Sequence, residues 1–256
     1  QNANLAISLL LGDKSKLDLD IKNSFSATGI AHILCVSGLH IGLILGFIQL
    51  ITKFICLFGL RFYYLRQILL VIIAWAIALI IGCTPSALRV ALMFTIFTIS
   101  KNLPIQTDSL NTLYCTAFFL LITNPLILFD ISFQLSFLAV LGILVCVPII
   151  KKILSKHKTK NFFKPIIQNA TISLSAQAFT APIIIYNFKT FPTSFLLTNV
   201  IVVPFLGFVL ISIIILILFV DIPILNTITS FLVEIELDVL IAIAKYVESL
   251  TLAITI

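Results

Sequence analysis

Long apolar runs separated by short polar segments follow one another along almost the whole chain. Residues 1–12 form the end of a short apolar helix, whereas residues 13–27 are polar and belong outside the hydrocarbon of a bilayer. The later runs are continuous and do not alternate, which favours α-helices over membrane β-strands. They predict membrane-crossing helices over residues 28–60, 66–82, 85–100, 108–123, 130–150, 166–186 and 194–220.

The last segment, residues 226–256, is apolar but carries the charged residues Glu234, Glu236, Asp238, Lys245 and Glu248. It therefore fits either an interfacial helix or a span that faces a wet cavity. The whole pattern predicts an all-α fold, a polytopic transmembrane bundle of about seven to nine helices. We expect one transmembrane domain over residues 1–256.

Composition identifies the bilayer as the solvent of this fold. Of the 256 residues, 61% are hydrophobic and 10% are charged, whereas soluble domains are about 25% charged. These values exclude an ordinary soluble protein, a disordered chain and a collagen-like fibre. The chain starts at Gln1 and its only methionine is Met93, so we expect a piece of a longer protein.

The distribution of Lys and Arg predicts the orientation. If 28–60 is one span and the sides alternate, most basic residues fall on the side that includes the loop 151–164. The positive-inside rule then places that loop in the cytoplasm and residues 13–27 outside. The same basic loop could instead bind anionic lipid or nucleic acid.

Polar residues interrupt the apolar stretch 28–60. His32, Ser37 and His40 fall within an arc of roughly 140° on a continuous helix and could share one face. Alternatively, the pair Ser37-Gly38 marks a kink or break, since glycine permits it. A break at membrane depth would leave backbone N–H groups that favour anions, with His40 in the first turn of the second half-helix.

Two other interpretations of this stretch remain open. Gly38, Gly42 and Gly46 form a small-xxx-small ladder that would permit tight helix packing. Ser37 and His40 have the spacing of a nucleophile and its base, although no third orienting residue is nearby. Packing explains Gly42 and Gly46 but not the two histidines.

A second polar set lies in residues 166–181. Asn169, Ser173, Gln177 and Thr180 fall within roughly 80° on a helix, which makes a polar stripe along most of one span. The stripe could form interhelical hydrogen bonds. A wet cavity suits it better, because four amides and hydroxyls in line seldom all find protein partners.

A third set joins two neighbouring spans. Arg89 lies one turn into its span, where a charge must be paired or face a channel. Asp130 and Gln134 share a helix face, and Asp130 could pair with Arg89. Since Asp130 lies at a span end, capping or snorkelling is the alternative.

Four motifs of the chain resemble the ComEC family of DNA-internalisation competence proteins, in its membrane domain. Residues 29–40 read G-I-A-H-I-L-C-V-S-G-L-H, close to the family pattern G-x-x-H-L-L-A-V-S-G-L-H. Residues 85–93 match P-S-x-x-R-A-x-x-M, with Val90 in place of the usual Ala, and residues 133–140 match F-Q-L-S-F-x-A-V. The run 175–182, followed by Asn199 and Pro204, also agrees, as does the lead-in at residues 9–13.

The resemblance implies carriage of one DNA strand across the bacterial cytoplasmic membrane during natural transformation. The expected partners are single-stranded DNA, membrane lipid and other competence proteins that deliver or pull the DNA, with homo-oligomerisation left open. Longer members carry an OB-like domain and a metallo-β-lactamase-like nuclease domain. No His-x-His-x-Asp-His cluster and no nucleotide-binding motif occur here, so we expect no enzymatic activity, no cofactor and no metal in this chain.

The charge balance agrees with such a path, since a net charge of +6 attracts a polyanion. The rival functions are a secondary transporter of a small anion, an intramembrane hydrolase using Ser37 and His40, and a membrane scaffold. For the DNA path we predict the phosphate-facing residues His32, Ser37, Gly38, His40 and Arg89, the polar lining Gln134, Asn169, Ser173, Gln177 and Thr180, and Asp130 as charge partner.

Overall fold

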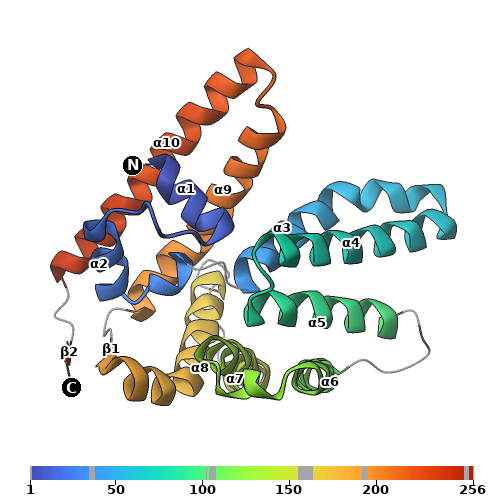
Figure 1. Ribbon diagram of the computed structural model, residues 1–256, viewed down its shortest axis with the longest axis horizontal. Coiled ribbons are helices and arrows are strands. Elements are labelled where there is room, and N and C mark those ends of the chain that lie inside the picture. The colour runs from blue at the N-terminus through green and yellow to red at the C-terminus, as the bar shows by residue number, and fades with distance from the viewer. Residues whose placement is uncertain are drawn as a thin grey trace. The chain divides into compact units, whose positions relative to one another are not determined.

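The chain is almost entirely helical in a computed structural model, which describes residues 2–34, 38–101, 103, 108–154, 164–191, 195–250 and 254–255 (Figure 1). Short 3-10 helices η1 (Ala31–Leu34), η2 (Thr52–Phe58) and η3 (Pro125–Phe129) lie between longer ones, and the two-residue strands β1 (Thr190–Phe191) and β2 (Ile254–Thr255) pair antiparallel. The α-helices of the described residues are α1 (Asn2–Leu11), α2 (Leu19–Ala27), α3 (Gly38–Ile51), α4 (Leu60–Ile80), α5 (Pro85–Lys101), α6 (Ser109–Thr123), α7 (Ile131–Leu154), α8 (Lys164–Phe188), α9 (Phe195–Leu218) and α10 (Pro223–Leu250).

The helical bundle expected from the apolar runs is confirmed. Most helices lie within a few residues of their predicted runs, but residues 28–60 form η1, α3 and η2 instead of one span. The described residues contain ten α-helices, since the N-terminal region supplies both α1 and α2. Among the described residues, four segments are long and apolar enough to cross a membrane by length and composition: Gly38–Ile55, Leu60–Ile80, Ile131–Ile153 and Thr198–Leu218. The chain is a membrane protein.

Residues Ser37–Val145 form one compact unit, here called the central unit. In it α3 packs on α4 and α5, α4 packs on α5, and α5 packs on α6 (Figure 1). The buried pairs Ala74 and Ala78 on α4 and Ala87 and Ala91 on α5 recur every four residues, so the backbones can approach closely. The Trp75 indole N–H donates to Thr95 Oγ1 at 3.1 Å and joins α4 to α5.

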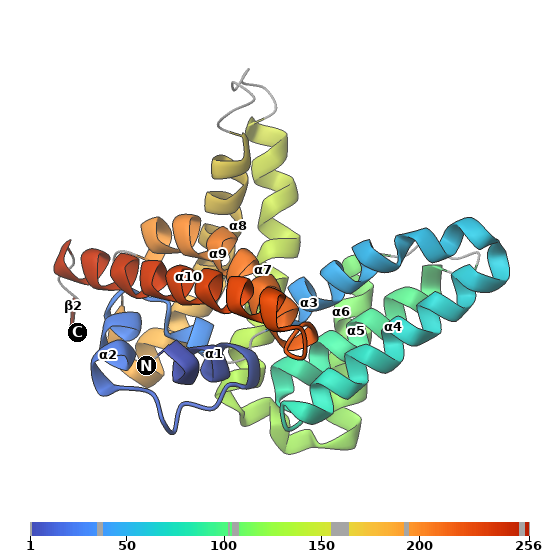
Figure 2. The same cartoon turned by 90° about the horizontal axis from the view of Figure 1, so that it is seen from above.

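Residues Gln1–Val36 and Cys146–Ile256 form the second unit, here called the terminal unit. Its core is the pair α9 and α10, with α1 and α2 packed on α10 and α8 packed on α9 (Figure 2). Leu206 and Leu210 of α9 and Leu237 and Leu240 of α10 are fully or almost fully buried between the helices. The helix α7 contains the boundary between the two units.

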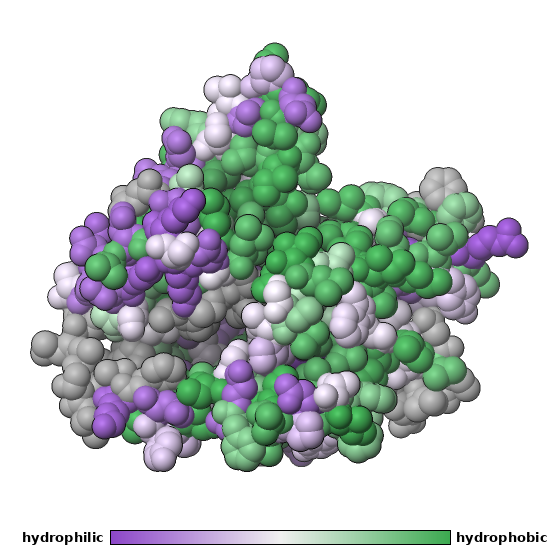
Figure 3. Space-filling model, in the orientation of Figure 1, coloured by the Kyte–Doolittle hydropathy of each residue, from purple (hydrophilic) through white to green (hydrophobic). Residues whose placement is uncertain are grey.

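Large apolar side chains also cover the outside of the helices. On α4, Leu60, Leu65, Ile68 and Ile72 are all more than half exposed, and hydrophobic side chains cover much of the face seen in Figure 3. Water would make such a surface an aggregation site, whereas acyl chains solvate it. The exposed surface therefore agrees with a lipid environment.

Helix α2 ends in a glycine-dependent turn at the start of the predicted span 28–60. The Ile30 N–H donates to the Phe25 carbonyl at 2.9 Å and the Gly29 N–H donates to the Ser26 carbonyl at 3.1 Å, as in a Schellman motif. Gly29 has a φ of 78°, a left-handed conformation that favours glycine. The first glycine of the motif at residues 29–40 thus ends a helix.

Replacement of this glycine should destabilise the fold. In Gly29→Ala the added Cβ lies in the left-handed region, which costs about 1–2 kcal/mol, so thermal unfolding in detergent should begin at a lower temperature. Gly42→Ala is the control, because no described atom lies within 4 Å of its Cβ and alanine is the better helix former. Equal unfolding temperatures for the two variants would contradict this account.

Candidate functional site

Arg89 is a buried cation near the start of α5. Its side chain is 7% exposed; Nε donates to Ser136 Oγ of α7 at 2.7 Å, and Nη1 lies 3.7 Å from Met93 Sδ. The guanidinium carbon also lies 6.0 Å from the centre of the Phe137 ring. No carboxylate of the described residues pairs with it. A buried charge without a counter-ion is costly, so this position points to an anionic ligand.

The guanidinium lies against the first residue of α3. A Cβ on Gly38 would overlap Arg89 Nη2 and lie 3.0 Å from Val90 Cγ2, so a side chain at this position would force the guanidinium to move. The N-terminus of a helix carries a partial positive charge and has N–H groups without partners inside the helix. Arg89 thus adds a full positive charge beside a partial one. His40, the third residue of α3, is buried at the same end.

A second buried arginine lies at the C-terminus of α3, where the helix dipole favours a cation. Arg66 of α4 is 7% exposed, and its Nη2 donates to the Gln49 carbonyl at 2.6 Å while Nε donates to Thr52 Oγ1 at 3.0 Å. A cation at a helix C-terminus satisfies free carbonyls and is stabilised by the helix dipole. Arg66 is therefore a cap at the C-terminus of α3. Arg89 lies at the N-terminus of α3, whose partial positive charge repels a cation and attracts anions.

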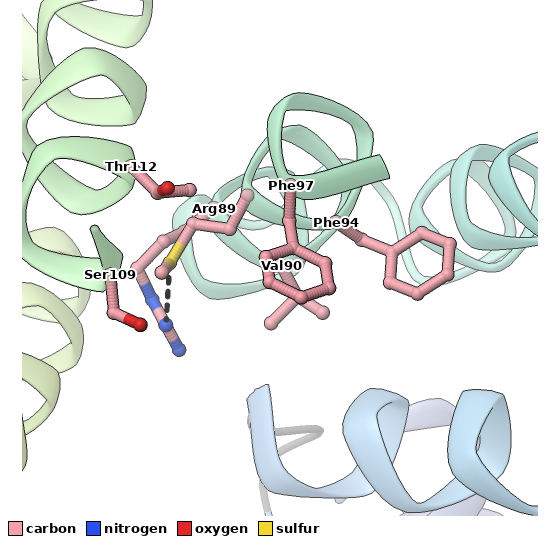
Figure 4. Close-up of a pocket in the computed structure, with 7 residues that line it drawn as sticks. Arg89, Val90, Phe94, Phe97, Ser109 and Thr112 are labelled. Atoms are coloured by element: carbon pink, nitrogen blue, oxygen red, sulfur yellow. Dashed lines mark hydrogen bonds between the residues drawn. The ribbon is translucent and has the colours of Figure 1, made fainter. Parts of the chain in front are cut away.

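A pocket of about 280 Å³ opens beside Arg89 between α5 and α6 (Figure 4). Arg89 and Ser109 lie on one side of it and the rings of Phe94 and Phe97 on the other. The pocket thus has a cationic, hydroxyl-bearing end and an apolar end. The seven lining residues are Arg89, Val90, Met93, Phe94, Phe97, Ser109 and Thr112.

The polar stripe of residues 166–181 lies on α8 in the terminal unit. Asn169, Ser173 and Gln177 are half-buried, and their side chains form no hydrogen bond to any described residue. Thr180 is buried and donates to the Ala176 carbonyl of its own helix at 3.0 Å. The expected alternative, interhelical hydrogen bonding, is therefore not seen for the stripe. Its amides and its serine hydroxyl keep their capacity for water.

Asp130 and Gln134 lie at the start of α7 and are not brought to the Arg89 side chain. Asp130 is exposed, and its Oδ1 accepts the backbone N–H of Ser132 at 2.7 Å and of Phe133 at 3.1 Å. The Gln134 amide donates to the Leu128 carbonyl of η3 at 2.9 Å. The structure shows no ion pair between Asp130 and Arg89, and Asp130 caps the helix instead.

The remaining predictions concern Ser37, His32 and the three glycines of α3. Ser37 and the side chain of His32 lie outside the described residues, so their predicted roles stay predictions. Gly38 is packed against α5, but Gly42 and Gly46 are exposed and no described atom lies within 4 Å of a Cβ at either. The packing ladder is wrong at these two positions, because each step of four residues turns about 40° around the helix.

Sequence reasoning missed the side chains that surround Arg89. Ser136 and Phe137 lie in the motif at residues 133–140, and Met93 ends the motif at residues 85–93. The two motifs thus meet at one guanidinium. The sequence contains no signal that places Ser136 and Phe137 beside Arg89, because they lie on another helix. In the part of the chain that the structure describes, no group of three His, Cys, Asp or Glu side chains could hold a metal ion.

Comparisons with known proteins agree with the motifs. The competence protein family matches residues 9–256. ComE operon protein 3 of Bacillus subtilis (strain 168) is 27% identical over 204 residues, which are 78% of this chain and 24% of that protein. An uncharacterized protein of Aquifex aeolicus (strain VF5) is 31% identical over 199 residues, 77% of this chain and 43% of that protein. The chain thus spans less than half the length of either relative, and no solved structure matches it.

The contact between Gly38 and Arg89 predicts a coupled pair. Gly38→Ala should destabilise the protein because its Cβ displaces Nη2, and most of this loss should vanish in an Arg89→Ala background. A double-mutant cycle of unfolding free energies in detergent should give a coupling of about 1–3 kcal/mol. Gly46→Ala should add to Arg89→Ala without coupling; the absence of coupling for Gly38→Ala would show that the two groups do not touch.

Proposed function

Because the chain belongs to the competence protein family, we propose that it forms part of the path along which single-stranded DNA crosses the bacterial cytoplasmic membrane during natural transformation. Family membership supports the role in DNA uptake. The observation that carries the finer proposal is the Arg89 guanidinium, buried without a carboxylate at the N-terminus of α3. A phosphodiester supplies the single negative charge that this position needs.

The proposed contact involves two kinds of donor. Arg89 Nη2 faces the first turn of α3, so one phosphate oxygen could accept from it while another accepts backbone N–H groups of that turn. Arg89 Nε already donates to Ser136 Oγ. This hydrogen bond holds the guanidinium in place and leaves fewer donors for a phosphate. One arginine, rather than a cluster, keeps each phosphate weakly bound, as a strand that slides requires.

The stripe on α8 provides the second part of the proposal. Asn169, Ser173 and Gln177 keep free amide and hydroxyl groups, which solvate water and sugar-phosphate without adding charge. A polar, neutral lining lowers the cost of moving a polyanion through lipid and does not trap it. His32, Ser37 and His40 belong to the proposed path as residues of the motif that contains Gly38.

We further propose the orientation given by the basic residues, with residues 13–27 outside and the loop 151–164 in the cytoplasm. Lys151 is exposed in the last turn of α7, where it would meet anionic lipid headgroups or the emerging strand. The chain has no nucleotide-binding motif, so other competence proteins are the proposed source of the DNA and of the pull on it.

Removal of the Arg89 charge should weaken both uptake and binding. Arg89→Gln should lower transformation frequency about tenfold, equivalent to about 1.4 kcal/mol of phosphate binding. For oligothymidylate binding to the protein in micelles, a plot of the logarithm of the binding constant against that of the salt concentration should become less steep by about 0.7. Arg61→Gln, an exposed arginine on α4, is the matched control and should leave both unchanged.

Three other outcomes would replace the proposal. Wild-type transformation with Arg89→Gln together with reduced uptake of inorganic phosphate would favour a small-anion transporter. Complete loss of function in Ser37→Ala, with normal expression, would favour the hydrolase. Wild-type behaviour of both variants would leave a scaffold.

An apolar substitution in the stripe should also slow uptake. Gln177→Leu removes a group that bonds water and should lower transformation frequency roughly fivefold, equivalent to about 1 kcal/mol. Ser175→Ala is the control on the same helix, because that hydroxyl is buried and already donates to the Thr171 carbonyl at 2.7 Å. Equal frequencies for the two variants, at equal protein levels on an immunoblot, would exclude the stripe from the path.

A further inference from the structure

A carboxyl group lies between α9 and α10 in the terminal unit, on helices that carry none of the residues proposed for the DNA path. Glu236 of α10 accepts a hydrogen bond from Ser212 Oγ of α9 at 3.0 Å through Oε1. Its other oxygen, Oε2, is buried and has no hydrogen-bond partner among the described residues. Ser212 lies inside the Thr198–Leu218 segment, which is apolar enough to span a membrane, so Glu236 is placed at the depth of a membrane helix.

The surroundings of Glu236 are apolar on both helices. Val209 and Ile213 flank Ser212 on α9, while Val233, Leu237 and Leu240 lie one turn or less from Glu236 on α10, and all five are at most 4% exposed. These side chains offer neither a proton acceptor nor a counter-charge. Glu236 is half-buried, and the Ser212 hydroxyl is the one described group that donates a hydrogen bond to its carboxylate. An ionised carboxylate with so few donors is costly at this depth.

No cation in the described part of the terminal unit pairs with Glu236. The helices packed on α10 are α9, α1 and α2; α9 and α1 contain no charged residue, and α2 contains Asp20 and Lys22. On α10 itself, Glu234, Asp238 and Lys245 are exposed, and the Asn2 amide donates to Asp238. Glu248 accepts from Ser24 of α2 and lies roughly 18 Å further along the helix axis.

We propose that Glu236 is an intramembrane proton-binding site, neutral while α9 and α10 are packed and ionised when water reaches it. A neutral carboxylic acid avoids the cost of a buried charge, and its carbonyl oxygen still accepts from Ser212. The bound species is a proton and not a metal ion, because one carboxyl and one hydroxyl supply too few oxygen ligands for a hard cation. The site would let the chain respond to a pH difference across the membrane, independently of whether it conducts DNA.

The proposal can be tested by carbodiimide labelling of the full chain in lipid nanodiscs. Dicyclohexylcarbodiimide partitions into apolar surroundings and reacts with a protonated carboxyl: the acid proton moves to one nitrogen and a carboxyl oxygen bonds to the central carbon. The acyl group then migrates to nitrogen, so a stable N-acylurea forms and nothing leaves. Peptide mass spectrometry at neutral pH should show Glu236 labelled at least about tenfold faster than Glu234, the equivalent of one unit in proton affinity.

Two variants separate the proton site from general accessibility. Glu236→Gln should abolish the label and the infrared band of a buried carboxylic acid, whereas Glu234→Gln should leave both unchanged. Ser212→Ala removes the donor that stabilises the ionised form, so labelling should persist to higher pH. The proposal is overturned if Glu236 reacts no faster than the exposed Glu234, or if the carboxylic-acid band survives in Glu236→Gln. DNA takes no part in these measurements, so their failure is distinct from failure of the proposed path.

Discussion

The contact between the Arg89 guanidinium and the glycine at the start of α3 is the constraint on which the central unit depends. It brings α5, α3 and α7 to one point, since the same group donates to Ser136 and occupies the space that a side chain on Gly38 would need. It also places a full positive charge beside the partial positive charge of the α3 N-terminus, in surroundings where acyl chains supply no negative charge. Packing and the proposed anion binding therefore involve the same side chain.

Hydroxyl groups show how the rest of the chain avoids such costs. Thr28, Thr95, Thr116 and Ser175 each donate to the carbonyl four residues earlier in their own helix, which satisfies them without any partner helix. Against this background the groups left over are informative. Asn169, Ser173 and Gln177 have no such bond, and one oxygen of Glu236 has none. These polar atoms, which have no hydrogen bond to a described residue, are the ones to which we assign water contact, phosphate passage or proton binding.

The apolar runs predicted most helix positions because each span must satisfy its backbone internally and expose apolar side chains to lipid. They failed where the cause was local stereochemistry or a long-range contact. Residues 28–60 look like one long helix, yet the left-handed Gly29 ends α2 at their start and the rest forms η1, α3 and η2. The buried state of Arg89 could be predicted from its position, but not its neighbours Ser136 and Phe137, which lie on another helix. Asp130 was a plausible partner of Arg89 by charge, but its carboxylate caps the N-terminus of α7 by accepting two backbone N–H groups.

Helix α3 is fastened at both ends by arginines from two different neighbours, Arg89 of α5 at Gly38 and Arg66 of α4 at Gln49. The distance between the two anchors is set by the number of residues in the helix, at about 1.5 Å each. Inserting or deleting a single residue between them would turn one anchor by about 100° relative to the other. The number of residues between the two arginine contacts is therefore fixed, whereas one apolar side chain on the sides of α3 can replace another.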